Sequence, residues 1–365
     1  MRPWERFAAV ARGGQADRVP VALIVDSPWL PGHAGIDTLD FFLRDDEWRR
    51  IYLNLRDRFP EVAWLPDWWI EYGMAAEPSA FGARINWHHD QPPSIEPVPG
   101  GLDVLIDIEP PNPQRHGLMP LVLQRYADAE RRLLPEGESI KMVAARGPFA
   151  VAGWLLGISE LMIALKKQPE KIERLLNTLT MTITRWLRAQ LDMLHAPEGI
   201  LVLDDIVGML SPKLFDQYAR PHMTRLFQAF DGLIKVYHND MPCPHLLAPM
   251  ANLGFDVFNF SHAIDIADAQ TRMPGIALMG NVPPLDIMVR STPDQVTAWA
   301  RECVRKTDGH KLILSAGGES VPAHRLKQSM RWSLQSEWMR RPALCLPDRL
   351  YRAIIRVAFY IRMRG

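Results

Sequence analysis

Short apolar runs alternate with longer segments of helical periodicity along this chain. The runs are rich in Val, Ile and Leu, which is typical of strands buried on both faces. They lie at 19–25, 62–66, 140–147, 199–205, 233–239, 255–260, 275–281 and 311–317. Several of the segments between them begin at Pro or at a Ser/Thr cap, as helices do. Eight strands with intervening helices predict an α/β fold, a closed parallel (β/α)8 TIM barrel. An open doubly wound sheet is the alternative.

Two stretches depart from this alternation. Residues 71–130 are rich in Pro, Gly and aromatic residues. We predict a hairpin and long loops, inserted after the second strand as a cover region, because such long loops are usually functional. Residues 343–365 combine several arginines with an apolar stripe at helical spacing. They predict a C-terminal helix that docks on the barrel or on a second subunit of a homodimer, with membrane-surface contact as the alternative. The whole chain, 1–365, is expected to be one barrel domain.

Charge and composition narrow the range of partners. The 365 residues include 42 basic and 42 acidic side chains, so no net field draws the chain to nucleic acid or to an anionic membrane. We expect no membrane insertion, since no apolar run reaches the roughly 18 residues that a span needs. The N-terminus lacks a signal-peptide pattern. The three cysteines are too widely spaced for a disulfide framework or a Cys-x-x-Cys site. These features predict a cytoplasmic protein with a small-molecule substrate.

Polar residues end nearly every predicted strand. In (β/α)8 barrels the catalytic groups project from the carboxyl ends of the strands. Residues at or just beyond these ends are Asp26, Arg146, Asp204, Asp205, His238, Asp240, His262, Asn281 and Glu319. Their convergence would gather acids and imidazoles in one concave mouth. The substrate-binding residues predicted there are Asp26, Trp29, Arg146, Trp154, His262 and Asn281.

Spacing singles out three of these residues as catalytic. Neighbouring strand residues point in opposite directions, so at most one of Asp204 and Asp205 faces the mouth. We favour Asp205; a cap for the helix near Ser211 is the alternative. His238 and Asp240 are two residues apart and share a side, which suits a metal or a proton-transfer pair. The alternative is a hydrogen-bonding core histidine followed by a turn residue.

Other side chains carry weaker signals. Cys243 is a candidate soft metal ligand, although a buried cysteine is the more common case. Aromatic residues near the mouth could sandwich a planar substrate, with packing as the alternative for each. They are Trp29, Trp68, Trp69, Trp87 and Trp154. His88 and His89 are adjacent and diverge, which favours a solvated hairpin. Glu71 and Glu77 flank a predicted loop over the barrel.

Four segments, in this order, resemble the uroporphyrinogen decarboxylase superfamily. They are ADRVPV near the start, GPFAVAGWLLG at 147–157, LSPKLFDQYARPH at 210–222 and MGNVPPLDIM at 279–288. The superfamily includes the decarboxylase and cobalamin-dependent methyltransferase components built on the same barrel. The resemblance spans essentially the whole chain and implies the same fold.

The resemblance favours the methyltransferase branch. The decarboxylase branch binds its tetrapyrrole with N-terminal arginines, and the matching stretch here, IVDSPWLPGHAG, has none. The methyltransferase branch holds zinc with His-x-Cys after the fifth strand and Cys after the eighth. Those positions look like His238, Asp240 and Gly318. The resemblance therefore implies a divalent metal, with zinc expected, held by His238 and Asp240 with Glu319 or Asp205; Cys243 is the further candidate that its position suggests. Carboxylates in place of thiolates suit oxygen-containing substrates.

These observations predict a demethylating methyltransferase. It would move a methyl group from a small O-methylated compound to a corrinoid (cobalamin) on a separate corrinoid protein, because the chain has no corrinoid-binding Asp-x-His-x-x-Gly module. The alternative is a cofactor-independent decarboxylase or lyase acting on a small acid, in which Asp26 or Asp205 would hold a developing cation. A non-catalytic binding barrel is disfavoured, because clustered polar strand ends cost stability.

Overall fold

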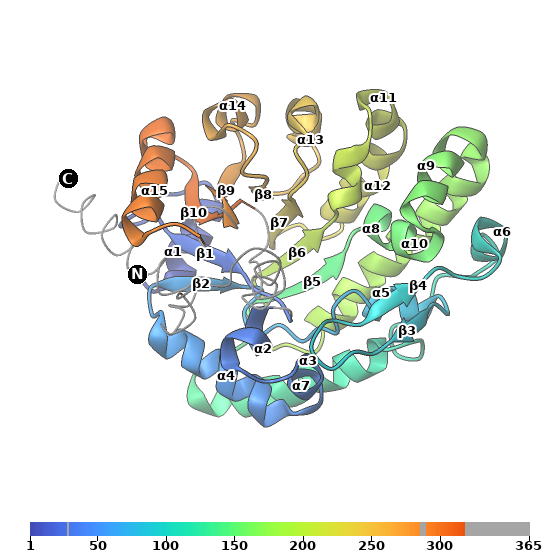
Figure 1. Ribbon diagram of the computed structural model, residues 1–365, viewed down its shortest axis with the longest axis horizontal. Helices are drawn as coiled ribbons and strands as arrows, with labels where there is room; N and C mark the ends of the chain where they lie inside the picture. The colour runs from blue at the N-terminus through green and yellow to red at the C-terminus, as the bar shows by residue number, and fades with distance from the viewer. Residues whose placement is uncertain (28, 285–289, 318–365) are drawn as a thin grey trace, which may run out of the picture.

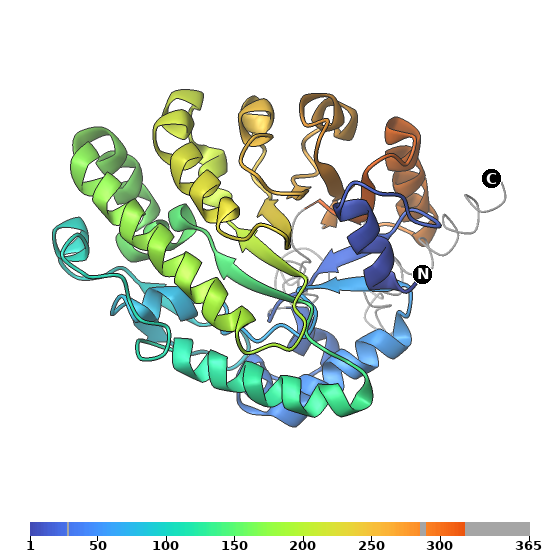
Figure 2. The same ribbon diagram turned by 180° about the vertical axis from the view of Figure 1, so that it is seen from behind.

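Eight parallel strands form a ring that is surrounded by helices (Figures 1 and 2). The computed structural model describes residues 1–27, 29–284 and 290–317. Its barrel strands are β1 (Val21–Ile24), β2 (Val62–Leu65), β5 (Met142–Arg146), β6 (Gly199–Leu203), β7 (Ile234–Asn239), β8 (Val257–Phe260), β9 (Ala277–Val282) and β10 (Leu312–Ala316). Each strand lies where the sequence predicted one. The predictions for Gly318, Glu319 and a helix at 343–365 fall outside the described residues.

The strand order confirms the (β/α)8 TIM barrel. The order β2-β1-β10-β9-β8-β7-β6-β5 pairs neighbouring strands in parallel all the way round. Among the described residues, β2 and β5 end this order without pairing to each other, so the ring has a seam between them. The carboxyl ends of all eight strands meet at one rim, which we call the mouth.

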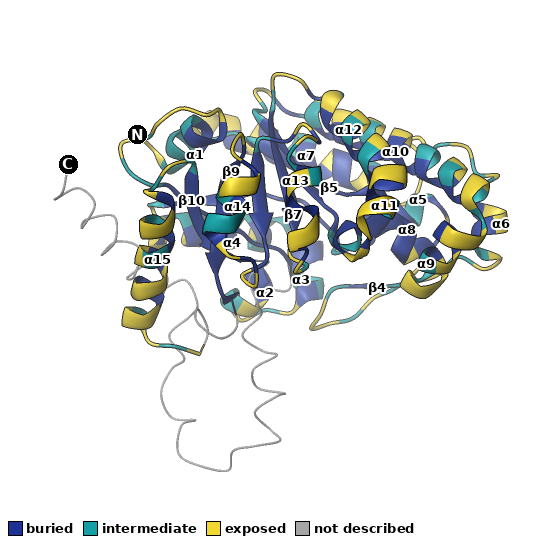
Figure 3. Cartoon of the chain, turned by 90° about the horizontal axis from the view of Figure 1, so that it is seen from above, coloured by how far each residue is buried: buried dark blue, intermediate teal, exposed yellow. Residues whose placement is uncertain are grey.

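Amphipathic helices cover the outside of the ring. In α10, buried residues such as Leu175, Leu179 and Trp186 recur at helical spacing, so one stripe packs inward. α15 begins with a Thr292–Gln295 capping box. The described helices are α1 (Pro3–Ala11), α2 (Trp29–Ala34), α3 (Thr38–Leu43), α4 (Asp45–Arg58), α5 (Ala76–Ala80), α6 (Gly101–Leu105), α7 (Met119–Leu133), α8 (Pro148–Leu156), α9 (Ile158–Lys167), α10 (Pro169–Leu191), α11 (Pro212–Leu214), α12 (Arg220–Gln228), α13 (Leu247–Met250), α14 (Ile266–Arg272) and α15 (Pro293–Thr307). Figure 3 shows exposed residues mainly on their outer faces and a buried ring of strands within.

The segment between β2 and β5 contains the predicted hairpin. β3 (Arg84–Asn86) and β4 (Ser94–Glu96) pair antiparallel. The rest of the segment is more helical than predicted, because α5, α6 and α7 lie within or across 71–130. α7 buries Val122, Tyr126 and Leu133 along one stripe, so it packs as a barrel helix instead of forming a loop.

The strands separate two apolar layers. An inner cluster fills the barrel, and an outer cluster lies between strands and helices. On β5, Met142 and Ala144 belong to the inner cluster, whereas Val143 and Ala145 belong to the outer one. This alternation follows from the two-residue period of a strand. It therefore gives the expected direction of the strand-end side chains, which their contacts then test.

Within the described parts of the chain, no helix taken singly is long and apolar enough to cross a membrane. α8 and α9 meet that length and composition only when they are joined, and they are bent by 106° at their junction. Most residues of α8 are buried in the folded protein.

Candidate functional site

Strand alternation directs His238 into the mouth. Ile234 and Val236, which precede it on β7, belong to the inner cluster, and Tyr237 belongs to the outer cluster. His238 therefore continues the inward-facing row, and its side chain is fully buried. Asn259 on β8 is its register partner and lies on the same face.

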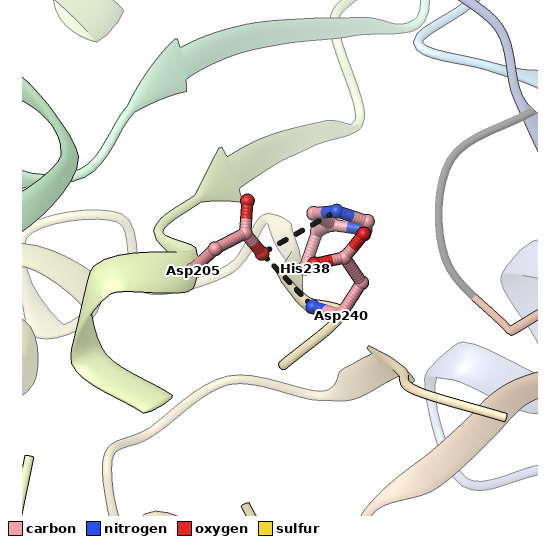
Figure 4. Close-up of side chains that lie close together, drawn as sticks. All are labelled: Asp205, His238 and Asp240. Atoms are coloured by element: carbon pink, nitrogen blue, oxygen red, sulfur yellow. Dashed lines mark hydrogen bonds and ion pairs between the residues drawn. The ribbon is translucent and has the colours of Figure 1, made fainter. Parts of the chain in front are cut away.

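Two aspartates complete a cluster around this histidine (Figure 4). Asp205 Oδ1 lies 3.6 Å from His238 Nε2 and accepts a hydrogen bond of 2.9 Å from the Asp240 backbone N–H. One nitrogen or oxygen from each of the three side chains lies within 4.8 Å of the other two. Asp205 is half-buried and Asp240 is exposed, so the cluster opens to solvent on one side. The structure thus brings together the three residues predicted as catalytic.

Asn259 determines which nitrogen of His238 carries the proton. The Asn259 Nδ2 group donates to the Met279 and Ala316 carbonyl oxygens at 2.8 and 3.1 Å. Its Oδ1 must then be the acceptor at 2.7 Å from His238 Nδ1, so Nδ1 carries the hydrogen. The lone pair of the neutral ring is therefore on Nε2, the nitrogen nearest Asp205. Sequence reasoning missed Asn259, although an asparagine inside the apolar run FDVFNF is a signal.

Asp204 faces away from this cluster, in agreement with the prediction that only one of the adjacent aspartates faces the mouth. Its Oδ2 accepts a 2.9 Å hydrogen bond from the Phe149 backbone N–H at the start of α8. Complete burial raises the pKa of this carboxyl well above its usual range. A Cβ on Gly147 would lie 2.3 Å from the Asp204 carboxylate, which requires glycine there. The helix near Ser211 is capped by the Ser211 hydroxyl itself.

Cys243, predicted as a metal ligand, lies apart from the candidate ligand group. Its thiol is fully buried and points to the Asn239 side chain at 4.0 Å. Burial raises the pKa of the thiol to about 12, as is typical of a cysteine in apolar surroundings. Among the described residues, the candidate ligand group contains Asp205, His238 and Asp240 without Cys243.

Asn281 was predicted to bind substrate, but the structure directs its side chain away from the mouth. Its Nδ2 donates to the Ile264 carbonyl oxygen at 2.6 Å, and its Oδ1 lies 3.6 Å from the Cys303 sulfur on α15. The side chain therefore faces the helix layer. His262, on the neighbouring strand end, is exposed, with Nδ1 3.4 Å from the Gly317 carbonyl oxygen. Its role in substrate binding stays a prediction.

The tryptophans predicted near the mouth fall into two groups. Some are buried in packing contacts, and the others are partly exposed or lie in the inner cluster. Trp29, predicted to contact substrate, is instead buried in the outer cluster, with its ring stacked on His33 and near Trp64. Trp68 is likewise buried, against Trp48 and Tyr52.

Two other tryptophans are partly exposed. Trp87 packs on Phe42 and Tyr72 and is 43% exposed. Trp154 is 37% exposed on α8, and its contact with substrate stays a prediction. By contrast, Trp69 belongs to the inner cluster that fills the barrel.

Buried charged residues line the seam side of the mouth. Arg146 continues the inward row of β5, and Asp26 continues that of β1, since Ala22 and Ile24 are both in the inner cluster. Both side chains are buried. Glu71 accepts a 2.6 Å hydrogen bond from the Ser27 backbone N–H, and Glu77 accepts one of 2.8 Å from that of Arg146.

The seam also contains a small cavity of about 20 Å³, large enough for a water molecule. Trp69, Glu71, Glu77 and Arg146 are among the residues that line it. Sequence reasoning placed the two glutamates on either side of a loop over the barrel, with each a candidate to line the pocket, and the structure sets them beside a strand-end arginine.

Glu77 makes the stability of the fold depend on pH. Burial raises the pKa of its carboxyl above the ordinary value of 4.5. Between these two values the folded state holds a proton that the unfolded state releases, so the free energy of unfolding falls as pH rises. The slope is roughly 1.4 kcal/mol per pH unit while this difference lasts. We expect Glu77→Gln to flatten this slope in urea unfolding at pH values above 4.5. The exposed Glu160→Gln is the control; an equal slope in Glu77→Gln and the original protein would contradict the assignment.

The fold and the cluster define a (β/α)8 barrel with a candidate metal centre at its mouth. The chain matches the model of the uroporphyrinogen decarboxylase (URO-D) family over residues 2–332, and it belongs to this family. It is 28% identical over 355 residues to the uroporphyrinogen decarboxylase of Synechococcus sp. (strain CC9605), covering 86% of this chain and 90% of that protein. It is 26% identical over 346 residues to that of Thermus thermophilus, with 86% and 91% covered.

Two solved structures share the fold. A methyltransferase from Methanosarcina mazei superposes with a TM-score of 0.79 at 18% identity, covering 99% of each chain. A B12-independent methionine synthase from Shewanella sp. W3-18-1, in complex with selenomethionine, gives a TM-score of 0.60 at 9% identity, covering 95% of this chain and 98% of that one. At these identities the likeness establishes the barrel alone.

Proposed function

We propose that this protein is the methyltransferase component of a demethylating system. It would take a methyl group from a small O-methylated compound and deliver it to a corrinoid on a separate protein. Asp205, His238 and Asp240 would hold a divalent metal, with zinc expected, at the mouth of the barrel. The observation that carries the proposal is the convergence of these three side chains with His238 Nε2 as the lone-pair nitrogen.

The donor set fits a divalent ion. One imidazole nitrogen and two carboxylate oxygens are ligands that zinc accepts, and two carboxylates balance a charge of two. Three protein ligands with one solvent-facing side leave a coordination position open, as catalytic zinc sites do. Asn259 supports the histidine in the way that outer partners orient metal ligands. When bound, such an ion polarises the oxygen from which the methyl group departs.

The chain's own residues would bind and orient the substrate and would protonate the oxygen that loses the methyl group. The methyl carbon–oxygen bond breaks, its electron pair stays on oxygen, and that oxygen takes up a proton. The electron pair for the new bond to the methyl carbon would come from a reduced corrinoid on the partner protein. Asp240 is the exposed member of the cluster and can pass a proton from solvent. The buried His238 and half-buried Asp205 would keep the oxygen aligned with the open side.

The test measures metal binding and methyl transfer together. Purified protein is loaded with zinc and incubated with a panel of methoxylated small molecules and reduced cobalamin. Methylated cobalamin is followed by its absorbance. We expect transfer that stops on chelation and returns with zinc. Transfer that is indifferent to chelation would contradict the metal site, and a panel with no transfer by zinc-loaded protein would contradict the methyltransferase proposal.

The second candidate is a decarboxylase acting on a small acid. The names of the matched relatives favour it, and Asp26 faces the mouth, where it can stabilise a developing positive charge. The same panel, supplied as carboxylic acids without cobalamin, distinguishes the two functions. Metal-independent release of carbon dioxide that Asp26→Asn abolishes would support this candidate.

A further inference from the structure

Asn239 is a buried polar residue to which the proposed methyl transfer assigns no role. It is the last residue of β7 and lies between His238 and Asp240 in the sequence. Because neighbouring strand residues point to opposite faces, its side chain is expected to leave β7 on the side away from the cluster. Its contacts agree with this direction. The side chain is fully buried, and its Nδ2 group lies 3.2 Å from the hydroxyl of Tyr237, a residue of the outer cluster.

The Asn239 amide joins the two loops that follow β6 and β7. Its Nδ2 group donates to the carbonyl oxygen of Asp204 at 3.0 Å, and its Oδ1 accepts from the Met241 backbone N–H at 3.1 Å. The first bond holds the peptide group that precedes Asp205, and the second holds the peptide group that follows Asp240. One planar side chain therefore fixes the backbone beside each aspartate of the cluster.

These two hydrogen bonds use none of the atoms that are candidate metal ligands. Asp205 Oδ1 also accepts from the Asp240 backbone N–H at 2.9 Å, but that oxygen belongs to the candidate ligand group. The bonds of Asn239 lie behind the cluster and stay available when the carboxylates take up an ion. Because Asn239 is fully buried, water does not replace these bonds when they are lost.

The close approach of the two loops depends on glycine at position 208. A Cβ atom on Gly208 would lie 2.9 Å from Asn239 Oδ1 and 2.6 Å from Met241 Cβ, which is too close for a real side chain. Gly208 belongs to the short helical turn that begins at Asp205. The thiol of Cys243 also points to Asn239 Oδ1, at 4.0 Å. Asn239 therefore lies at the centre of the contact between the loops.

We propose that Asn239 is a positioning residue for the metal centre, because it fixes the separation of the Asp205 and Asp240 carboxylates before an ion binds. This inference rests on the metal site of the proposed function and adds how that site is held ready. Ligands whose spacing is set in advance lose less freedom when they bind an ion. A fixed spacing also favours zinc, which accepts a small four-coordinate ligand set, over ions that need six oxygen ligands.

Zinc affinity and the spectrum of bound cobalt test this role. Asn239→Leu keeps the approximate size of the side chain and removes both hydrogen bonds. We expect it to weaken zinc binding about tenfold or more, as the loss of an outer partner of a metal site does. The dissociation constant is measured by competition with a chromophoric chelator. Unchanged zinc affinity in a folded Asn239→Leu protein would overturn the proposal.

The cobalt spectrum separates positioning from stability. Cobalt(II) loaded in place of zinc reports its coordination by its visible absorption, which is strong for a four-coordinate ion and weak for a six-coordinate one. We expect Asn239→Leu to weaken this absorption, because carboxylates that are free to move admit further water ligands. Weaker binding with an unchanged cobalt spectrum would indicate a role in stability alone, and would also overturn the proposal.

Tyr237→Phe is the matched control. The Tyr237 hydroxyl donates to the same carbonyl oxygen of Asp204 at 3.0 Å, and the bond from Asn239 to Met241 stays in place without it. Its loss should lower the stability of the fold and leave the cobalt spectrum unchanged. A Tyr237→Phe protein whose cobalt spectrum changes as much as that of Asn239→Leu would contradict the specific role of Asn239.

Gly208→Ala tests the same contact from the other loop and does not depend on the folding of Asn239→Leu. The added methyl group pushes the loops apart without removing a hydrogen-bonding group, so zinc affinity should fall. Gly153→Ala is its control, since a Cβ on this α8 glycine would meet Ile206 and Ile158 at ordinary contact distances of 3.6 and 3.7 Å. Equal zinc affinity in the two glycine variants would overturn the proposal.

Zinc binding and methyl transfer are measured on the same samples, so this inference and the proposed function can fail separately. Zinc binding that depends on Asn239, in protein that transfers no methyl group, would support the positioning role and contradict the methyltransferase. Zinc-dependent transfer that persists in Asn239→Leu at the original zinc affinity would do the reverse. An original protein that binds no zinc would contradict both.

Discussion

Replacing His238 with alanine is expected to remove zinc from the protein. His238 contributes the single nitrogen of the candidate ligand set, and its Nε2 lies 3.6 Å from Asp205 Oδ1. Without it, two carboxylates on an open rim remain, one of them exposed. We expect near-stoichiometric zinc in the original protein and almost none in His238→Ala, measured by elemental mass spectrometry after dialysis. Asp205→Asn and Asp240→Asn should lower the zinc content less severely, because each leaves the imidazole in place.

The matched control is His310→Ala. His310 is exposed and precedes β10, at the end of the barrel opposite the mouth. Its removal should leave the zinc content unchanged, while circular dichroism verifies that both variants are folded. Equal zinc in His238→Ala and His310→Ala would place the metal elsewhere and contradict the proposed centre. Metal-free protein in every variant would direct attention to the decarboxylase candidate.

Replacing Asn259 with leucine is expected to weaken zinc binding by about 10- to 100-fold, the usual effect of losing an outer partner of a metal ligand. Asn259 Oδ1 lies 2.7 Å from His238 Nδ1 and holds the hydrogen there. Leucine has a similar size but no acceptor, so the ring would lose both its orientation and its preferred tautomer. The dissociation constant is measured by competition with a chromophoric chelator.

Asn281→Leu separates this effect from loss of stability. Asn259 and Asn281 are both buried on the last part of neighbouring strands, and each donates to a backbone carbonyl. The Asn281 side chain faces the helix layer, so its loss should lower stability without weakening zinc binding. A comparable loss of affinity in the two variants would show that general loosening of the barrel, and not the histidine tautomer, controls the site.

The barrel alone does not determine the reaction. Folds of this kind support many chemistries through the residues at their strand ends. The assignment to the URO-D family fixes the architecture, and the relatives that share it are named as decarboxylases. The proposal of methyl transfer therefore depends on the cluster at the ends of β6 and β7. The experiments on His238 and Asn259 address that cluster directly.

Much of this protein's fold could be predicted from local patterns in the sequence. A strand buried on both faces must be a continuous apolar run, so eight such runs predicted the eight barrel strands. Because parallel strands in a barrel end at one rim, their last polar residues were expected at one mouth. The two-residue period of a strand put His238 and Asp240 on one side and separated Asp204 from Asp205. These rules act over a few residues, and the sequence alone therefore determined the fold and the three cluster residues.

Tertiary structure decided what depends on distant neighbours. Asn259 supports His238 from 21 residues away, and Glu77 meets Arg146 across 69 residues of sequence. Cys243 and Asn281 had suitable positions near strand ends, but the Asn281 side chain meets Cys303 in the helix layer and Cys243 is fully buried. Contacts of this kind depend on how helices and strands pack in three dimensions. A local pattern gives the direction expected for a side chain, whereas only the assembled barrel determines where it points and which group it meets.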